Sequence, residues 1–461
     1  MICYPDKVHS FSYNGSRLFY SAGKQKLVNV NQYGAAILTI AKNSTGIDNI
    51  VRKCAEQFDL PADEIRTATI DFLRRMTDNG FLGDEIDNRN GEVISAPKQT
   101  GTGVVFKELY LHLTNECNLS CWYCYNKDFR ISNEHQADLM IDEFEQIITQ
   151  FSELGGQSII FTGGEPLLFP PAIALARLAR TVGLQTSLLT NGTLCNAQNA
   201  PEICKCFNQI IVSLDSKYPE EHEALRGKDS FARTVAGIKC LSGFLRENPS
   251  ETTLYCRPVI TKNNIRNILE YPEFMINELG CSRAMPNSYV PNELSDFDSG
   301  NFLSFQEINS CLVKFHSILD KLGGITSYDF MSLKNCSRCS AGNAIISIAP
   351  DGSIYPCQSL HNRNVSLGNI RDGRLDHIVE KSAVSKFFRE FHHSQIATCK
   401  DCGLGSLCGG GCRAIAYNYY LDLNAYNEIY CPFLRQGLEF GLWLKSLEEI
   451  WDRNVDNPIF H

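Results

Sequence analysis

The chain has 461 residues, of which 43% are hydrophobic and 21% charged, and its formal net charge is −9 at pH 7. This length predicts two or three domains, and this composition excludes disorder for most of the chain. The acidic balance argues against a nucleic-acid partner held by phosphate contacts, and no apolar run reaches the roughly 18 to 20 residues that span a bilayer, so neither nucleic acid nor membrane is expected as a partner.

The chain contains 20 cysteines, a number that suggests disulfides in a small secreted protein. Here the chain is large, and its first residues, MICYPD, lack the apolar core of a signal peptide. We therefore expect a reducing, cytoplasmic location, with cysteines used for purposes other than disulfides.

Residues 1–84 read as a small α+β unit, with strand-like runs at 10–19 and 26–29 and helical patterns at 32–42, 47–58 and 62–79. This order, ending in FLRRMTDNGFL, resembles the winged-helix module of enzymes that modify ribosomally made peptides, the RiPP recognition element. The resemblance implies that the module captures the leader of a precursor peptide as an added strand. The alternative is a winged-helix domain that only packs.

Residues 85–103 are polar, contain glycine and proline and show no apolar period, which predicts a linker that lets the first module move. An ordered loop lying on the next domain is the alternative. In residues 104–290 short apolar strands alternate with amphipathic helices, which predicts an α/β fold, an open (β/α)6 TIM-like barrel. The strands are expected at 108–114, 158–162, 185–190, 209–214, 252–260 and 282–290.

The first of these strands leads into Cys117, Cys121 and Cys124, spaced C-x3-C-x2-C, with the aromatic Tyr123 before the last cysteine. Three thiolates can hold three irons of a [4Fe–4S] cube and leave the fourth iron open to a small molecule. The segment resembles the cluster loop of the radical S-adenosylmethionine (radical SAM) enzymes. A zinc knuckle or three buried thiols are the alternatives, but a structural zinc site takes four ligands and no fourth is evident nearby.

The later strand ends carry polar groups that, in this type of fold, gather at one end of the barrel. The radical SAM resemblance implies that the segment Gly163, Gly164, Glu165 and Pro166 binds the amino group of SAM, with its carboxylate and carbonyls as acceptors. It also implies that Ser213 and Arg226 contact SAM, with Asn191 and Asp215 close by. Each of these residues could instead be a strand-end cap.

Residues 291–335 contain an amphipathic helix at about 305–322 and are expected to form a connector. Residues 336–461 follow with eight cysteines, the number that two fully coordinated [4Fe–4S] clusters need. These are Cys336, Cys339, Cys357, Cys399, Cys402, Cys408, Cys412 and Cys431.

The strings CSAGNAIISIAPDGSIYPC and CKDCGLGSLCGGGC resemble the SPASM domain of radical SAM enzymes that modify peptides and proteins, with Gly352 as the glycine of its pattern. The resemblance assigns one cluster to Cys336, Cys339, Cys357 and Cys412, and the other to Cys399, Cys402, Cys408 and Cys431. Three [4Fe–4S] clusters are therefore expected, one for SAM and two auxiliary. Zinc ribbons are the competing explanation of C-x2-C pairs.

The combined resemblance implies that a 5′-deoxyadenosyl radical made from SAM takes a hydrogen atom from a precursor peptide, and that a thioether or a C–C or C–O crosslink results. An external electron donor of the flavodoxin or ferredoxin type is implied, whereas the catalytic acid or base and the oligomeric state stay unknown. A sulfatase-maturing oxidase is one alternative. It carries an aspartate after the YPC string, where this chain has Gln358, an amide that cannot take a proton. A non-catalytic iron–sulfur electron carrier is the other alternative.

Overall fold

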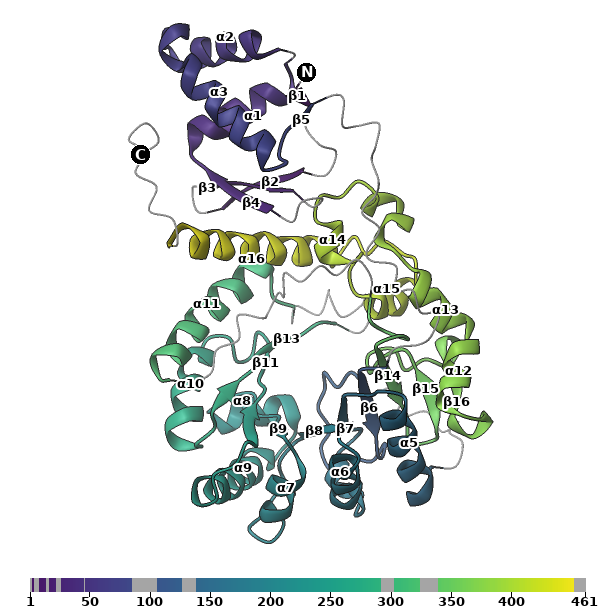
Figure 1. Ribbon diagram of the computed structural model, residues 1–461. Helices are drawn as coiled ribbons and strands as arrows, with labels where there is room; N and C mark the ends of the chain where they lie inside the picture. The colour runs from purple at the N-terminus through teal and green to yellow at the C-terminus, as the bar shows by residue number, and fades with distance from the viewer. Residues whose placement is uncertain are drawn as a thin grey trace.

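The computed structural model describes residues 2–3, 8–13, 16–21, 26–44, 46–84, 106–126, 138–291, 302–323 and 339–451. The predicted linker at 85–103, Cys336, and residues 292–301 and 324–335 of the predicted connector lie outside these residues. Three parts follow one another along the chain: a small N-terminal module, a barrel and a C-terminal part that reaches back to both (Figure 1).

The N-terminal module consists of a three-stranded antiparallel sheet in the order β2-β3-β4, three helices and a short strand pair. Its elements are β1 (Ile2–Cys3), β2 (Val8–Tyr13), β3 (Ser16–Ser21), β4 (Lys26–Val30), α1 (Gln32–Lys42), α2 (Ile47–Phe58), α3 (Ala62–Asp78) and β5 (Gly83–Asp84). The helices lie where the apolar periodicity predicts them. The run at 10–19, however, is a hairpin in which Tyr13 pairs with Ser16, and the intervening Asn14-Gly15 is the sequence signal for such a turn.

The barrel is built from parallel strands that neighbour one another in chain order, as predicted for a partial (β/α)6 barrel. Its strands are β6 (Glu108–His112), β7 (Ser158–Thr162), β8 (Gln185–Thr190), β9 (Gln209–Val212), β10 (Thr253–Cys256) and β12 (Arg283–Ala284). Its outer helices are α5 (Ile141–Glu153), α6 (Ala172–Thr181), α7 (Ala200–Cys206), α8 (Pro219–Arg226) and α9 (Ser230–Glu247), followed by α10 (Tyr271–Glu273) and α11 (Phe305–Lys321).

The last two predicted strands are each broken into two short pieces. Beyond β10 and β12, the strands β11 (Val259–Ile260) and β13 (Asn287–Ser288) form a parallel pair of their own. Pro258 and Pro286 stand at the two breaks. Proline has no N–H to donate to a ladder and restricts the residue before it, so the continuous strands predicted at 252–260 and 282–290 do not form.

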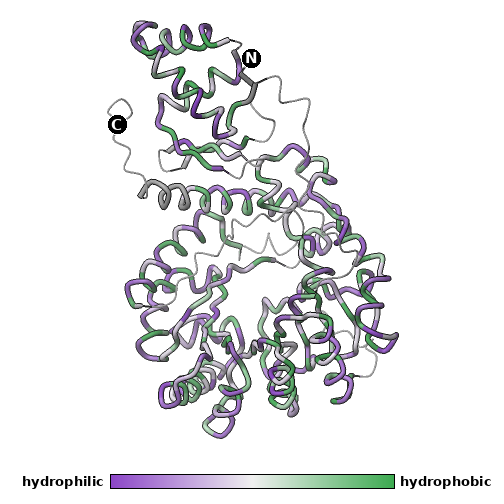
Figure 2. Tube along the Cα trace, viewed as in Figure 1, coloured by the Kyte–Doolittle hydropathy of each residue, from purple (hydrophilic) through white to green (hydrophobic). Residues whose placement is uncertain are grey.

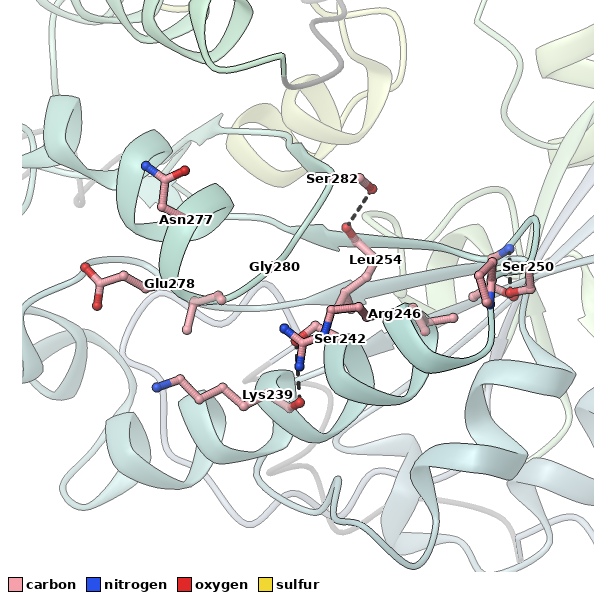
Figure 3. A pocket seen from close by; sticks show the side chains of 13 residues that line it. Lys239, Ser242, Arg246, Ser250, Leu254, Asn277, Glu278, Gly280 and Ser282 are labelled. Atoms are coloured by element: carbon pink, nitrogen blue, oxygen red, sulfur yellow. Dashed lines mark hydrogen bonds between the residues drawn. The ribbon is translucent and has the colours of Figure 1, made fainter.

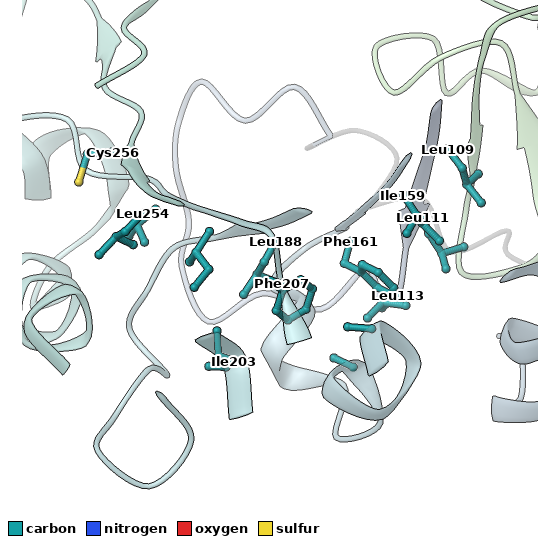
Figure 4. Packing of buried hydrophobic residues seen from close by; sticks show 14 of the residues in the cluster. Leu109, Leu111, Leu113, Ile159, Phe161, Leu188, Ile203, Phe207, Leu254 and Cys256 are labelled. Carbon is teal, nitrogen blue, oxygen red and sulfur yellow. The ribbon is translucent and has the colours of Figure 1, made fainter. Parts of the chain in front are cut away.

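Alternation along the strands separates a core from a lumen. Leu109, Leu111 and Leu113 are buried with Phe161 and Leu188 in the core between the strands and the outer helices (Figure 4). The residues between them face the opposite side, which is the inside of the barrel. The outer helices alternate hydrophobic and hydrophilic segments in Figure 2, as expected for helices with one buried face.

The C-terminal part adds strands to the barrel sheet instead of forming a separate sheet. Strand β14 (Ile345–Ile348) pairs in parallel with β6, and β15 (Ser353–Tyr355) and β16 (Gly368–Asn369) continue the sheet in antiparallel pairing. The helices α12 (Leu375–Lys381), α13 (Ala383–Glu390), α14 (Gly405–Cys408), α15 (Arg413–Tyr420) and α16 (Cys431–Trp451) follow. The cluster loop after β6 and the segment around Cys357, which follows β15, are thereby carried by one sheet, with β14 between their strands.

Helix α16 lies between the N-terminal module and the rest of the molecule (Figure 1). Phe11, Leu18 and Tyr20 of the module's sheet form one buried apolar cluster with Leu438 and Leu442 of α16. His9 Nε2 lies 2.8 Å from a carboxylate oxygen of Glu439 on the same helix. This interface holds the module against the cysteine-rich end of the chain, whereas the sequence predicted a module that moves.

Candidate functional site

The cluster loop follows the C-terminal end of β6, where the sequence placed it. Cys117, Cys121 and Cys124 are partly exposed, and the backbone N–H of Trp122 donates to the carbonyl of Leu225 at 3.3 Å. Burial raises the pKa of the Cys121 thiol to about 11, against the lowering effect of Arg226, and the other two thiols raise it further. The three sulfurs therefore lie close enough to influence one another's ionisation.

Most described cysteines outside the predicted ligand set are buried, whereas the predicted ligands are not. Every described member of the predicted ligand set is partly or fully exposed. Cys54, Cys195, Cys204, Cys206, Cys256, Cys281 and Cys311 are buried, and Cys240, which is not a predicted ligand, is partly exposed. Burial is what thiols that pack as small apolar side chains show, so exposure agrees with the predicted ligand set but does not define it. Within the described residues no three His, Cys, Asp or Glu side chains converge on a point that could hold a single metal ion.

The paired glycines bring the second strand end against the cluster loop. A Cβ atom on Gly163, whose φ is 132°, would lie 2.3 Å from the carbonyl oxygen of Thr114, and one on Gly164 would lie 1.9 Å from that of Glu116. The N–H of Gly164 donates to Thr114 at 2.7 Å. Glycine is required at both positions because any side chain would collide with the backbone that carries the cysteines.

Glu165 is buried and connects two strand ends. Its carboxylate accepts hydrogen bonds from the Thr190 hydroxyl and the Asn191 N–H, both at 2.7 Å, and from the Leu167 N–H at 3.2 Å. Burial raises the pKa of Glu165, and these donors oppose the shift. The carboxylate therefore fixes the third strand end beside the second, and binding of an ammonium group by this segment stays a prediction. Pro166 is buried at the start of the following turn.

Asn191 supports the cluster loop from the third strand end. Its side-chain amide donates to Asn118 Oδ1 at 2.8 Å and lies 4.0 Å from the Cys117 sulfur. Asn118 in turn donates to the Thr193 hydroxyl at 2.8 Å. Sequence reasoning did not single out Asn118, although its position between two cysteines and its amide side chain were available as a signal.

Asp215 and Arg226 form a buried ion pair beside the loop. Arg226 Nε and Nη2 donate to the two carboxylate oxygens at 2.6 and 3.1 Å, and the Tyr123 hydroxyl donates to the same carboxylate at 2.5 Å. Burial alone would raise the pKa of Asp215, but the Arg226 guanidinium holds it below its usual range. Arg226 Nη1 points to the Cys121 sulfur at 3.9 Å. Ser213, partly exposed, ends β9 on the lumen side.

The described cysteines of the C-terminal part form two groups. The charges of Cys339 and Cys412 contribute to raising the pKa of the Cys357 thiol. Those of Cys399, Cys402 and Cys431 do the same for the Cys408 thiol. These groups match the two predicted ligand sets, with Cys336 outside the described residues. The residues Cys339, Cys357, Cys399, Cys402, Cys408, Cys412 and Cys431 nevertheless stay predicted ligands, since the groups alone do not identify what they bind.

Arg413 is a buried cation between the two cysteine groups and was missed by sequence reasoning. Its guanidinium donates to the carbonyls of Leu423 and Ala425, both at 3.0 Å, and its charge acts on Cys412, Cys339, Cys399 and Cys408. Anionic thiolates or clusters on both sides would offset the cost of burying this charge. Its place directly after Cys412 was the available signal.

One surface pocket lies away from this site. It has a volume of about 580 Å³ and is lined by residues such as Lys239, Arg246, Thr252 and Ser282 (Figure 3). Thr252 and Ser282 precede β10 and β12, so the pocket is at the end of the barrel opposite the cluster loop. Active groups of such barrels gather at the C-terminal ends of the strands, which excludes this pocket as the reaction site.

Three family models match the chain. Residues 111–271 match the Radical SAM superfamily, residues 339–403 match SPASM, an iron-sulfur cluster-binding domain, and residues 18–82 match coenzyme PQQ synthesis protein D (PqqD). Within the described residues no helix is long and apolar enough to cross a membrane.

Relatives and solved structures extend these matches. The chain is 26% identical over 329 residues to an AdoMet-dependent heme synthase of Oleidesulfovibrio alaskensis, covering 66% of this chain and 81% of that protein. It is 28% identical over 312 residues to the antilisterial bacteriocin subtilosin biosynthesis protein AlbA of Bacillus subtilis, covering 65% of each. The crystal structure of Streptococcus suis SuiB bound to its precursor peptide SuiA superposes with a TM-score of 0.58 at 14% identity, covering 94% of this chain and all of that one. That likeness confirms the predicted fold class.

Proposed function

We propose that this chain, whose residues 111–271, 339–403 and 18–82 match the Radical SAM, SPASM and PqqD families, is a radical SAM enzyme that installs a crosslink in a ribosomally synthesised precursor peptide. The bond is a thioether or a C–C or C–O link between side chains. One observation carries the proposal: a cysteine loop held by residues at three neighbouring strand ends shares a chain with a docked PqqD-type module. The names of AlbA and of the SuiA-bound SuiB structure, which concern a bacteriocin and a precursor peptide, support this choice of substrate.

The chemistry that a reduced cluster and SAM supply when bound is cleavage to methionine and a 5′-deoxyadenosyl radical, which removes a hydrogen atom from a substrate carbon. The residues of this chain bind and orient. Gly163 and Gly164 let the segment proposed to bind the amino group of SAM lie directly against the cysteine loop, and Ser213 offers a hydroxyl. Asp215 fixes the guanidinium of Arg226 through Nε and Nη2, so that this cation is held beside the loop for a carboxylate. Such preorganisation lowers the entropy cost of placing SAM.

Two auxiliary [4Fe–4S] clusters are proposed at the two C-terminal cysteine groups, which makes three clusters in all. Arg413 lies between these groups and would partly neutralise their negative charge, one of the determinants of cluster potential. An external flavodoxin or ferredoxin would supply electrons in a reducing cytoplasm. The auxiliary clusters would accept the electron left when the new bond forms.

The leader peptide is proposed to add as a strand to β4. Strand β4 pairs with β3 on one side and is an edge of the sheet order β2-β3-β4. The other edge, β2, is obstructed, since a Cβ on Gly403 would lie 2.7 Å from Cβ of His9. Edge strands offer unpaired N–H and C=O groups to an incoming chain.

Heme synthesis is the competing function, because several relatives carry the name AdoMet-dependent heme synthase. The PqqD-type module favours a peptide over a porphyrin. The buried Gln358 amide oxygen, which has no hydrogen-bond partner within the described residues, lies where a sulfatase-maturing oxidase carries its aspartate and argues against that oxidase.

The proposal is tested with the anaerobically reconstituted full chain and the short precursor peptide encoded beside its gene. We expect release of 5′-deoxyadenosine and a mass loss of two hydrogens in the peptide, and neither in a Cys121→Ala variant. Absence of 5′-deoxyadenosine from the native chain would leave the electron-carrier alternative. Modification of a porphyrin but not of the peptide would favour heme synthesis.

Leader binding is tested by hydrogen–deuterium exchange of the same full chain. We expect the precursor peptide to protect amides of residues 26–30, with residues 8–13 unchanged as the internal control. A leaderless peptide should protect neither strand. Protection confined to residues 8–13 would contradict the assignment to β4.

A further inference from the structure

A polar cavity of about 410 Å³ occupies the inside of the barrel. Its walls include Glu108 and Tyr110 of β6, Ser187 and Leu189 of β8, and Arg257, which follows β10. On each strand the lining residues alternate with the core leucines and isoleucines, and the cavity continues to the N-terminal strand ends at Gln157, Gln185 and Asn208. It is therefore the lower part of the barrel lumen, below the strand ends that carry the cluster loop. Because barrel lumens are normally filled by packed apolar side chains, a polar lumen of this size suits a ligand.

Strand register places Arg257 in the same row as the predicted SAM contacts. Cys256 pairs with Val212, so the next residues along, Arg257 and Ser213, are neighbours, and the Arg257 N–H donates to the Val212 carbonyl at 2.9 Å. Thr190 also pairs with Val212, which brings Asn191 into this row. Arg257 is therefore at the top of the lumen, between the cavity and the site proposed for SAM.

The guanidinium of Arg257 has no counter-ion within the described residues. Its Nε is buried without a hydrogen-bond partner, and its Nη2 contacts the Met285 sulfur at 3.9 Å. The titratable groups that face it are the phenols of Tyr110 and Tyr255. Arg226 differs from Arg257 in this respect, because the Asp215 carboxylate pairs with the charge of its guanidinium.

Glu108, which lines the same cavity, is not a counter-ion of Arg257. It lies two residues below Tyr110 on β6 and shares a hydrogen bond with the Tyr110 hydroxyl. Burial raises the pKa of Glu108, and its hydrogen bond goes to Tyr110 and not to Arg257. A partly buried guanidinium whose Nε has no partner within the described residues is costly, and an anion that enters the lumen would recover part of that cost.

We propose that Arg257 binds a carboxylate of the precursor peptide and thereby holds the adjacent carbon at the SAM-facing end of the lumen. The planar fork of arginine matches a carboxylate through two parallel N–H···O bonds. The substrate class is therefore a core peptide with an aspartate, a glutamate or a C-terminal carboxylate at the reacting position. This inference rests on the proposed function, since it specifies the substrate of the same site.

Carboxylate binding is measured on the reconstituted full chain by saturation-transfer difference NMR, with N-acetylglutamate as the probe and N-acetylglutamine as its neutral match. We expect transfer to N-acetylglutamate only, lost in Arg257→Gln and partly kept in Arg257→Lys. The control is Arg283→Gln. Arg283 faces the same side of the next strand, but it donates to the Tyr255 hydroxyl at 3.1 Å and does not line the cavity. Equal transfer in the native chain and Arg257→Gln would overturn the proposal.

Turnover separates this inference from the proposed function. We expect Arg257→Gln to raise the KM for the precursor peptide about 10- to 100-fold, with a much smaller change in the KM for SAM. Peptides with single Asp→Asn or Glu→Gln changes, or with a C-terminal amide, identify the carboxylate that Arg257 binds. The peptide that lacks this carboxylate should have the same KM with the native chain as with Arg257→Gln. A raised KM for SAM instead of peptide would mean that Arg257 holds the carboxylate of SAM, and would also overturn the proposal. Native-like radical formation with no carboxylate effect would refute the inference and leave the proposed function standing.

Discussion

Replacing Asp215 by asparagine tests whether the buried ion pair organises the site. The carboxylate is fully buried and receives two N–H groups of Arg226, the Tyr123 hydroxyl and the Val259 N–H, the last at 2.9 Å. Asparagine keeps the shape and loses the charge, so the guanidinium of Arg226, whose side chain is 8% exposed, stays buried without a counter-ion. Removing one partner of a buried pair costs about 3–5 kcal/mol.

We expect the free energy of unfolding of Asp215→Asn to fall by about 3–5 kcal/mol, measured by urea denaturation of the cluster-free chain. The KM for SAM should rise as well, because Arg226 loses its fixed orientation. The matched control is Asp71→Asn, since Asp71 pairs with Arg74 at 3.3 Å on the surface and both side chains are more than half exposed. That change should not alter stability measurably.

A double variant decides whether the charge is the cause. Adding Arg226→Met to Asp215→Asn removes the uncompensated cation, so part of the lost stability should return while SAM cleavage stays impaired. If the single variant is as stable as the native chain, or if the double variant is less stable than the single one, the reasoning from the ion pair is wrong.

Three further outcomes are expected. Gly164→Ala should abolish assembly of the first cluster, measured by iron content and 5′-deoxyadenosine release, because its methyl group would overlap the Glu116 carbonyl, whereas Gly243→Ala, with no atom within 4 Å, should not. Arg413→Gln should lower iron and sulfide content in the C-terminal part and shift the reduction potentials of the clusters that remain, and native potentials would contradict its proposed place between them. Burial lowers the pKa of His112 from 6.5 to about 3, so below pH 6.5 the unfolded chain binds a proton that the folded chain does not. The free energy of unfolding is therefore unaffected by this group above pH 6.5 and falls on acidification, by about 2 kcal/mol at pH 5. His112→Gln should show a flatter dependence of Tm on pH than the native chain.

The cysteine spacings and the strand ends were readable from the sequence because they are local. C-x3-C-x2-C sets three thiols on one short loop wherever that loop lies, and period-2 runs bounded by turn residues mark β6 to β9. The Gly163-Gly164 pair was likewise visible, although its reason was not. The sequence suggested approach to a ligand, and the structure shows that the carbonyls of Thr114 and Glu116 leave no room for a side chain.

The apolar contacts of the N-terminal module could not be read in the same way. Phe11 and Leu18 belong to a strand pattern with one buried face, but a pattern does not name the surface that buries it. Leu438 and Leu442, more than 400 residues later, supply that surface. The polar, glycine-bearing linker at 85–103 therefore suggested a mobile module, although the apolar face of the module's sheet packs on α16.

By itself, the sequence determined the three parts of the chain, the fold class, the helices and the candidate ligand cysteines, because period, spacing and turn residues act over a few positions. Tertiary structure alone decided that β14 continues the barrel sheet, that Arg413 lies between two cysteine groups, and that Arg257 stands beside Ser213 with no counter-ion among the residues described. These facts depend on which strands pair and in which register. Register is set by the fit of whole faces packed together, and it places residues side by side that no local pattern connects.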